Sequence, residues 1–95
     1  MATLTYQIKK REQFNEELRA AVPEQEIAED ILTGLFFALR HFPEQGVPTG
    51  RASPLPVYAW RIQATERNRP LIVYYCFQHP AVLLLSVRVT EEEED

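Results

Sequence analysis

Arginine is the residue type with the clearest binding chemistry in this chain, and it is concentrated in the second half. The five candidate binding residues are Arg51, Arg61, Arg67, Arg69 and Arg88. Between residues 46 and 90 the only acidic residue is Glu66, although the whole chain has a net charge of −4. Guanidinium groups bind phosphates and carboxylates through paired hydrogen bonds. This pattern predicts a surface for an anionic target; the alternative is that the arginines only keep a strand-rich half soluble.

The other reactive side chains favour structural roles. His41 ends a predicted helix, where the helix dipole stabilises a cation, and His79 stands in a predicted turn without partners at metal-binding spacing. At least one of Tyr74 and Tyr75 must face the core, while the other either packs or stacks on a nucleic-acid base. Cys76 is a lone cysteine inside an apolar run and is expected to be buried. We therefore expect no disulfide, no metal site and no cofactor, and we assign no catalytic residue.

Acidic residues are predicted to lie in solvent. Glu12, Glu16 and Glu17 fit an exposed helix face. The run Glu91–Asp95 is an acidic tail with two readings, since it either aids solubility or folds back on the arginines and competes with a polyanion. Ordering a free terminus costs conformational entropy, which favours the first reading.

The first half of the chain predicts one strand followed by two helices. Apolar and polar residues alternate over Thr3–Lys9, as in a half-buried strand. A short helix is expected over Gln13–Val22 and a longer one over Glu24–Phe42. Apolar residues recur every four positions in the longer helix, at Ile27, Ile31, Leu35 and Leu39.

The second half predicts a loop and three strands. The loop covers Glu44–Pro56 and is rich in Pro and Gly. The strands are expected at Val57–Ala64, Leu71–Gln78 and Val82–Thr90, joined by connections short enough for antiparallel hairpins. The alternation places Tyr58, Trp60, Ile62, Leu83, Leu85, Val87 and Val89 beneath the helices. It places Arg61, Gln63, Ser86 and Arg88 on the opposite face.

This order of elements predicts an α+β fold, β-α-α-β-β-β. Two helices would pack on one face of a mostly antiparallel four-stranded sheet, which buries their apolar stripes. Residues 1–90 would form a single domain and residues 91–95 the acidic tail. The chain has 95 residues, and 45% of them are hydrophobic, which suits one globular domain. Without a signal peptide or an apolar run of about 18 residues, we expect a cytoplasmic protein that does not enter a membrane.

Four segments of the second half carry a family resemblance. They are Gly50–Leu55, Tyr58–Ile62, Arg67–Tyr75 and Leu83–Arg88. In this order they give a Gly-containing loop, an aromatic–Arg pair, a basic turn before an apolar-Tyr strand, and a last strand that ends near an Arg. This order resembles that of the RelE/ParE-like toxins of bacterial toxin–antitoxin modules. The topology covers the whole chain, and the likeness in residues covers its second half.

The resemblance implies a toxin-like protein with a cognate antitoxin. Some relatives cut mRNA on the ribosome, and others inhibit DNA gyrase without cutting. Arg61 and Arg88 match positions where the family keeps basic residues on the open sheet face. Arg51 and Arg69 could add phosphate contacts, and Arg67 lies in the same basic turn.

The chain departs from cleaving members of the family at the end of the last strand. Those members usually place Tyr, His or Lys after the final Arg, whereas Val89 and Thr90 here lead into the acidic tail. Arg69 is followed by Pro70, whereas members of the family usually have a basic residue followed by an apolar residue just before the central strand. We therefore expect a toxin-like protein that binds a macromolecular target with weak or absent nuclease activity. An mRNA-cleaving toxin and a non-toxic interaction protein stay open as alternatives, as do a homodimer and association through a strand edge.

Overall fold

The computed structural model describes residues 5–52 and 55–90 of the chain. The elements in order are β1 (Gln7–Lys10), α1 (Glu12–Ala21), α2 (Gln25–His41), the 3₁₀ turn η1 (Pro43–Gln45), β2 (Val47–Ala52), β3 (Pro56–Ile62), β4 (Leu71–Gln78) and β5 (Ala81–Val89). The predicted acidic tail and the start of the predicted first strand lie outside the described residues. No helix in the described ranges is long and apolar enough to cross a membrane.

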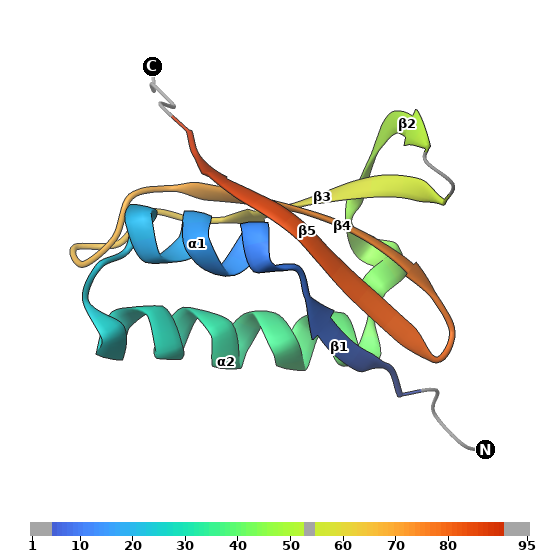
Figure 1. The fold of residues 1–95 in the computed structure, drawn as a ribbon, viewed down its shortest axis with the longest axis horizontal. Coiled ribbons are helices and arrows are strands. Elements are labelled where there is room, and N and C mark those ends of the chain that lie inside the picture. The colour runs from blue at the N-terminus through green and yellow to red at the C-terminus, as the bar shows by residue number, and fades with distance from the viewer. Residues whose placement is uncertain (1–4, 53–54, 91–95) are drawn as a thin grey trace.

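The strands form one mixed sheet in the order β1-β5-β4-β3-β2. All neighbouring pairs are antiparallel except β1, which runs parallel to β5. The helices α1 and α2 lie side by side and share one hydrophobic core with the sheet (Figure 1). The predicted α+β fold is therefore confirmed, and the three strands β3, β4 and β5 lie within about two residues of their predicted bounds.

The sheet has five strands where the sequence predicted four, because β2 forms inside the predicted loop. Val47 pairs with Ala59 and Pro48 with Tyr58, and the register then shifts before Ala52. The composition of β2 is poor for a strand, since it contains Pro and Gly. The strand forms because its backbone pairs with β3 at the edge of the sheet, not because its residues favour a strand.

The core forms where the apolar stripes of the two helices meet the sheet. Phe14 and Leu18 of α1 and Leu35 and Leu39 of α2 are buried, as the helical spacing predicted. Tyr75 on the central strand β4 is fully buried among them. Tyr58, Trp60 and Ile62 pack against the edge of this core, which confirms the predicted inward face of β3.

A β-bulge in β5 reverses part of the predicted inward face. Tyr75 pairs with Leu84 and Tyr74 pairs with Ser86, so that Leu85 has no partner on β4. One extra residue moves all positions before it to the other face. Val82 and Leu84 are therefore buried instead of the predicted Leu83 and Leu85, while Val87 and Val89 pack inward as predicted.

Strand β5 continues past the end of β1, and a side chain takes over the pairing. β1 pairs with β5 only as far as Leu84. Beyond it, the backbone N–H of Val87 donates to Oε1 of Glu17 at 2.9 Å, and Gln13 donates to Oε2 of the same carboxylate at 3.1 Å. Glu17 is half-buried, so its predicted place in solvent was wrong, whereas Glu12 and Glu16 are exposed as predicted.

Removing the Glu17 carboxylate should destabilise the sheet. We expect Glu17→Ala to lower the free energy of unfolding by about 1–3 kcal/mol, because the Val87 N–H loses a charged acceptor. Glu17→Gln keeps an acceptor oxygen and should lose less. The exposed neighbour substitution Glu16→Ala should change stability by less than about 0.5 kcal/mol. Urea unfolding measures all three variants, and equal losses for Glu16→Ala and Glu17→Ala would refute the assigned role.

Candidate functional site

The face of the sheet turned away from the helices, here called the open face, presents side chains in cross-strand rows that include two arginines. Arg61, Ile72 and Arg88 are partners across β3, β4 and β5 and form one row. Ala59, Tyr74 and Ser86 form the next row. Neighbouring strands lie about 4.8 Å apart, so the backbones of Arg61 and Arg88 are separated by roughly 10 Å. The strand alternation predicted that these two arginines share a face, and the register agrees.

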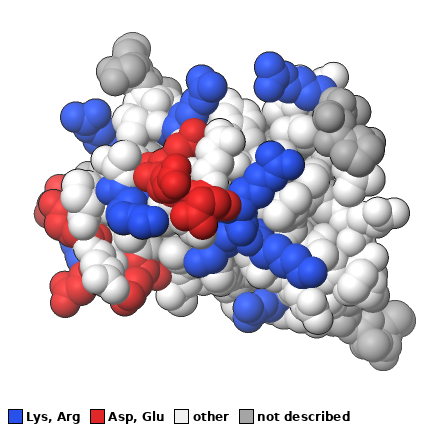
Figure 2. All heavy atoms as spheres, viewed as in Figure 1, with Lys and Arg blue, Asp and Glu red and all other residues white. Residues whose placement is uncertain are grey.

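The open face is hollowed next to these rows. A concavity of about 540 Å³ runs from β2 across β3, β4 and β5 to the start of α1. Arg11, Arg51 and Arg88 line it together with Tyr74 and Ser86. Figure 2 shows basic side chains gathered over the side of the molecule formed by β1 and β5, beside the acidic residues of α1.

A turn within β2 positions Arg51 at the concavity. The hydroxyl of Thr49 donates to the carbonyl of Val57 at 2.9 Å and accepts from the backbone N–H of Arg51 at 3.2 Å. Gly50 between them has φ +85°, a left-handed conformation that side-chain-bearing residues rarely adopt. The glycine and the threonine together hold β2 against β3 at this point.

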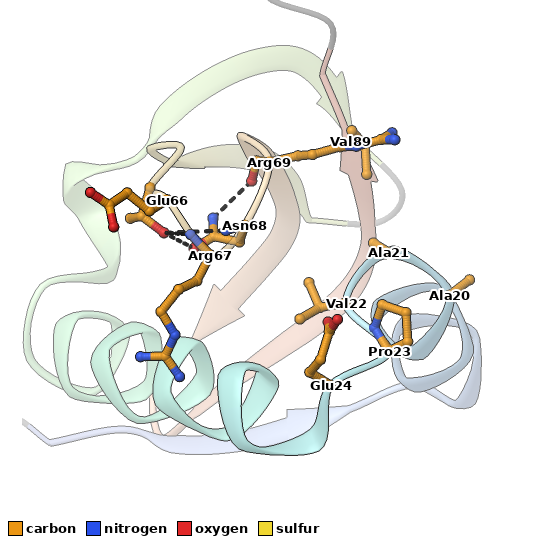
Figure 3. A pocket seen from close by; sticks show the side chains of 11 residues that line it. Ala20, Ala21, Val22, Pro23, Glu24, Glu66, Arg67, Asn68, Arg69 and Val89 are labelled. Atoms are coloured by element: carbon orange, nitrogen blue, oxygen red, sulfur yellow. Dashed lines mark hydrogen bonds between the residues drawn. The ribbon is translucent and has the colours of Figure 1, made fainter.

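Arg67 and Arg69 lie away from the open face. They belong to the turn between β3 and β4, where the Thr65 hydroxyl accepts from the backbone N–H groups of Arg67 and Asn68 at 3.0 and 3.2 Å. This turn borders a second concavity, of about 550 Å³, shared with the connection between α1 and α2 (Figure 3). The predicted five-arginine set is therefore split between two regions, with Arg51, Arg61 and Arg88 on the sheet.

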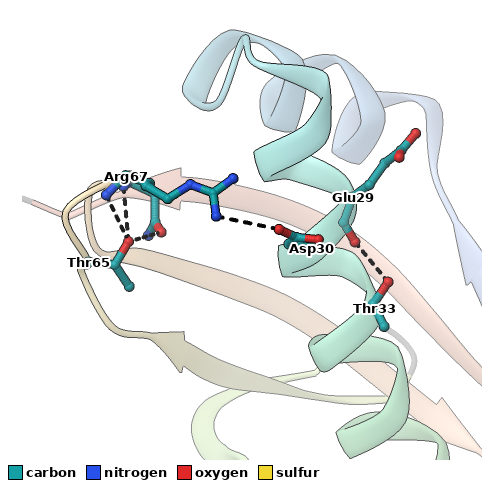
Figure 4. Close-up of polar contacts among 6 residues, drawn as sticks. Glu29, Asp30, Thr33, Thr65 and Arg67 are labelled. Carbon is teal, nitrogen blue, oxygen red and sulfur yellow. Dashed lines mark hydrogen bonds and ion pairs between the residues drawn. The ribbon is translucent and has the colours of Figure 1, made fainter.

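Arg67 already faces a carboxylate of its own chain. Its Nη1 lies 3.6 Å from Oδ2 of Asp30 on α2 (Figure 4). The two side chains are 57% and 72% exposed, so the pair adds little stability. It does place a counter-ion beside a guanidinium that the sequence had assigned to target binding.

The two adjacent tyrosines have opposite places. Tyr75 is buried, and its hydroxyl donates to the carbonyl of Pro43 at 2.6 Å. Burial raises the pKa of Tyr75 above its ordinary value, so the phenol stays protonated as a donor. Tyr74 instead lines the concavity of the open face. The sequence left this choice open, and the structure presents Tyr74 as the ring available to a target.

The two histidines and the cysteine pack against other parts of the chain. The His41 ring lies 4.9 Å from that of Phe37 at the end of α2, and the His79 ring lies 5.0 Å from that of Tyr6. Cys76 is buried as predicted, and burial raises the pKa of its thiol. Among the described residues, no group of three or more His, Cys, Asp or Glu side chains is arranged to hold a metal ion.

Arg11 is the functional candidate that sequence reasoning missed. It follows β1 directly, and its backbone N–H donates to the carbonyl of Leu84 at 3.1 Å. The parallel pairing of β1 with β5 therefore brings a residue from the start of the chain next to Ser86 and Arg88. The helical and strand patterns of the sequence carry no signal for this long-range contact.

The concavity has a lining that can bind an anionic group. Its described lining residues offer three guanidinium groups, hydroxyl groups, a phenol ring and several apolar side chains. They include no carboxylate and no imidazole, the usual proton acceptors at neutral pH. The arrangement suits an anionic group held by arginines next to a ring or base packed on Tyr74.

Comparison by sequence finds no match, either to a protein-family model or to a curated protein. Comparison by structure does find similar proteins. A chain of the toxin–antitoxin complex RelBE2 from Mycobacterium tuberculosis is similar with a TM-score of 0.68 and 17% identity, covering 96% of this chain and 98% of that one. A chain of the chromosomal ParDE toxin–antitoxin system from P. aeruginosa is similar with a TM-score of 0.64 and 15% identity, covering 92% and 98%.

Proposed function

From its RelE/ParE-like fold, we propose that this chain is the toxin-like component of a toxin–antitoxin module and acts by binding a macromolecular target. The observation that carries the proposal is the open face, where Arg51 and Arg88 line a concavity together with Tyr74, and Arg61 shares a cross-strand row with Arg88. The two similar structures are toxin–antitoxin complexes, which supports a cognate antitoxin as partner. The proposed domain comprises residues 1–90, with residues 91–95 as a tail, and acts in the cytoplasm.

We propose that nuclease activity is weak or absent. RNA cleavage needs a proton acceptor near the 2′-OH and a donor near the leaving oxygen. The described lining of the concavity has no carboxylate or imidazole for the first task. The ribosome with its mRNA and DNA gyrase are the candidate targets, both of which a cationic surface can approach.

An mRNA-cleaving toxin is the second candidate, and one observation favours it. Tyr74 places a phenol among Arg11, Arg51 and Arg88, where it could donate a proton to a leaving oxygen beside a bound phosphate. Cleavage of translated mRNA in cells that express the chain would support this candidate over binding alone.

Expression in bacteria tests the proposed function. The full chain alone should arrest growth, and the double variant Arg61→Ala, Arg88→Ala should relieve the arrest because the open face loses two cations. The matched control is Arg67→Ala, Arg69→Ala, which removes the same charge from the turn between β3 and β4 and should still arrest growth. Circular dichroism of the purified variants confirms that they fold.

Two outcomes would contradict the proposal. Normal growth with confirmed soluble expression of the unmodified chain would favour a non-toxic interaction protein on the same fold. If only the control variant Arg67→Ala, Arg69→Ala relieves the arrest, the target-binding surface is the turn between β3 and β4 and not the open face. Restoration of growth by the product of an adjacent small gene would identify the antitoxin.

A further inference from the structure

Helix α2 presents a largely exposed face to solvent, here called the outer face. Its exposed residues, spaced three and four apart, are Glu26, Asp30, Thr33, Gly34 and Phe37, and the half-exposed His41 continues the stripe. Figure 1 shows α2 along one margin of the molecule. Phe37 is 64% exposed in the middle of this face, although the opposite side of the helix supplies Leu35 and Leu39 to the core.

Gly34 has no side chain, and the space that a side chain would occupy on the outer face, one turn away from Phe37, is here called the hollow. Apart from its chain neighbours and the nearby backbone of its own helix, a Cβ built on Gly34 would meet no atom of the described chain within 4 Å, so the packing of this molecule does not require a glycine there. A glycine inside an exposed helix lowers its stability by about 1 kcal/mol relative to alanine. A protruding ring and a hollow of this kind on the same helix face are complementary to each other.

The charges on α2 are distributed in a complementary way. The first half of the helix and the residue before it carry Glu24, Glu26, Glu29 and Asp30, and the last turn carries Arg40 and His41. Two such helices placed antiparallel bring the acidic half of each against the basic end of the other. Two parallel helices would instead place acidic halves together, which is unfavourable.

We propose that a second copy of this chain covers the outer face, with the two α2 helices antiparallel about a two-fold axis between Gly34 and Phe37. Phe37 of each copy then fills the hollow at Gly34 of the other, and Asp30 lies opposite His41 of the other copy. The contact is self-complementary, as a two-fold dimer requires. Asp30 already contacts Arg67 through Oδ2, and a carboxylate has a second oxygen that can accept from the other copy.

The proposed contact leaves the open face exposed on both copies. The outer face belongs to α2, whereas Arg51, Arg61 and Arg88 belong to strands β2, β3 and β5. The dimer would therefore present two target-binding surfaces in one particle. This inference does not depend on the proposed function, because association of the chain with itself is measured without any target.

Sedimentation velocity of the purified full chain over a range of concentrations tests the dimer. The unmodified chain should pass from monomer to dimer, and Phe37→Ser should raise the dimer dissociation constant about tenfold or more, as loss of a central aromatic contact does. Gly34→Leu should have a similar effect by filling the hollow, while the helix itself becomes more stable. The matched control is Val47→Ser, because Val47 is 63% exposed on edge strand β2.

The register can be tested by exchanging charges. Asp30→Lys and His41→Asp should each weaken the dimer, and the double variant Asp30→Lys, His41→Asp should restore it, since opposite charges then face each other again. A monomer at all concentrations would overturn the proposal. Weakening by Val47→Ser but not by Phe37→Ser would overturn it in favour of association through the β2 edge. Loss of antitoxin binding in Phe37→Ser, with a monomeric unmodified chain, would assign the outer face to the antitoxin.

Discussion

The substitution Tyr75→Ala is expected to lower the free energy of unfolding by about 3–5 kcal/mol. Tyr75 is fully buried on the central strand, and its ring lies 5.8 Å from that of Tyr58 and 6.3 Å from that of Phe77. Its hydroxyl reaches the carbonyl of Pro43, the residue that begins the turn before β2. A loss of this size is a large part of the stability of a small domain, so the variant should be largely unfolded at 37 °C.

Two milder substitutions separate the contributions of the ring and the hydroxyl. Tyr75→Phe keeps the ring but leaves the Pro43 carbonyl unpaired, and should lower the free energy of unfolding by about 1–3 kcal/mol. Gly46→Ala should lower it by about 1–3 kcal/mol, because a Cβ there would overlap the phenol oxygen and come within 3.1 Å of the Ala59 carbonyl. Gly34→Ala is the control and should not lower the free energy of unfolding, since its Cβ would point into open space.

The raised pKa of Tyr75 gives this prediction a pH dependence. Stability from a group whose pKa is higher in the folded state is complete below the unfolded value of 10.0 and is lost as pH rises above it. The unmodified chain should therefore become less stable above about pH 10, and Tyr75→Phe should lose less over the same range. Urea unfolding at several pH values measures this. Equal alkaline sensitivity of the two proteins would contradict the burial of the Tyr75 phenol.

The second large effect is expected at Tyr74 and rests on the proposed function. Tyr74→Ala should relieve growth arrest as fully as the Arg61 and Arg88 double variant, because a ring that stacks on a base contributes about 1–3 kcal/mol to binding. Tyr74→Phe keeps the ring and should still arrest growth. Growth at graded inducer concentrations measures the difference, with thermal unfolding to confirm that both variants fold.

The phenylalanine variant also distinguishes binding from cleavage. If the Tyr74 phenol donates a proton during RNA cleavage, Tyr74→Phe should be as inactive as Tyr74→Ala. If the protein acts by binding, the two variants should differ. Full arrest by Tyr74→Ala would contradict a role of the ring in either mechanism and leave the arginines as the target contacts.

The parts of the fold that follow local patterns were predictable from the sequence. The four-residue spacing from Ile27 to Leu39 predicted α2, and the apolar runs predicted β3, β4 and β5. Strand β2 was not predictable, because Pro48 and Gly50 argue against a strand and only pairing with β3 forms it. The bulge at Leu85 was not predictable either. One unpaired residue changes which side chains of β5 are buried, but the residue types of the strand give no sign of it.

The candidate site was predictable only where its residues share a strand pattern. Alternation along β3 and β5 placed Arg61 and Arg88 on one face, and the register agrees with it. Arg67 and Arg69 have the same chemistry, but the turn that carries them lies beside the helices. Arg11 reaches the concavity through a contact between distant parts of the chain, which periodicity cannot reveal.

The parallel pairing of β1 with β5 has a consequence for how the protein is made. Among the described strands β1 pairs only with β5, so the strand synthesised first cannot join the sheet before the strand synthesised last in the described chain. Closing such a long loop is slow and gives no stabilising contacts until it is complete. Arg11 and Arg88 therefore cannot meet on a nascent chain. A cell that produces this protein encounters the assembled basic surface only after β5 has been translated, and shortened translation products lack it.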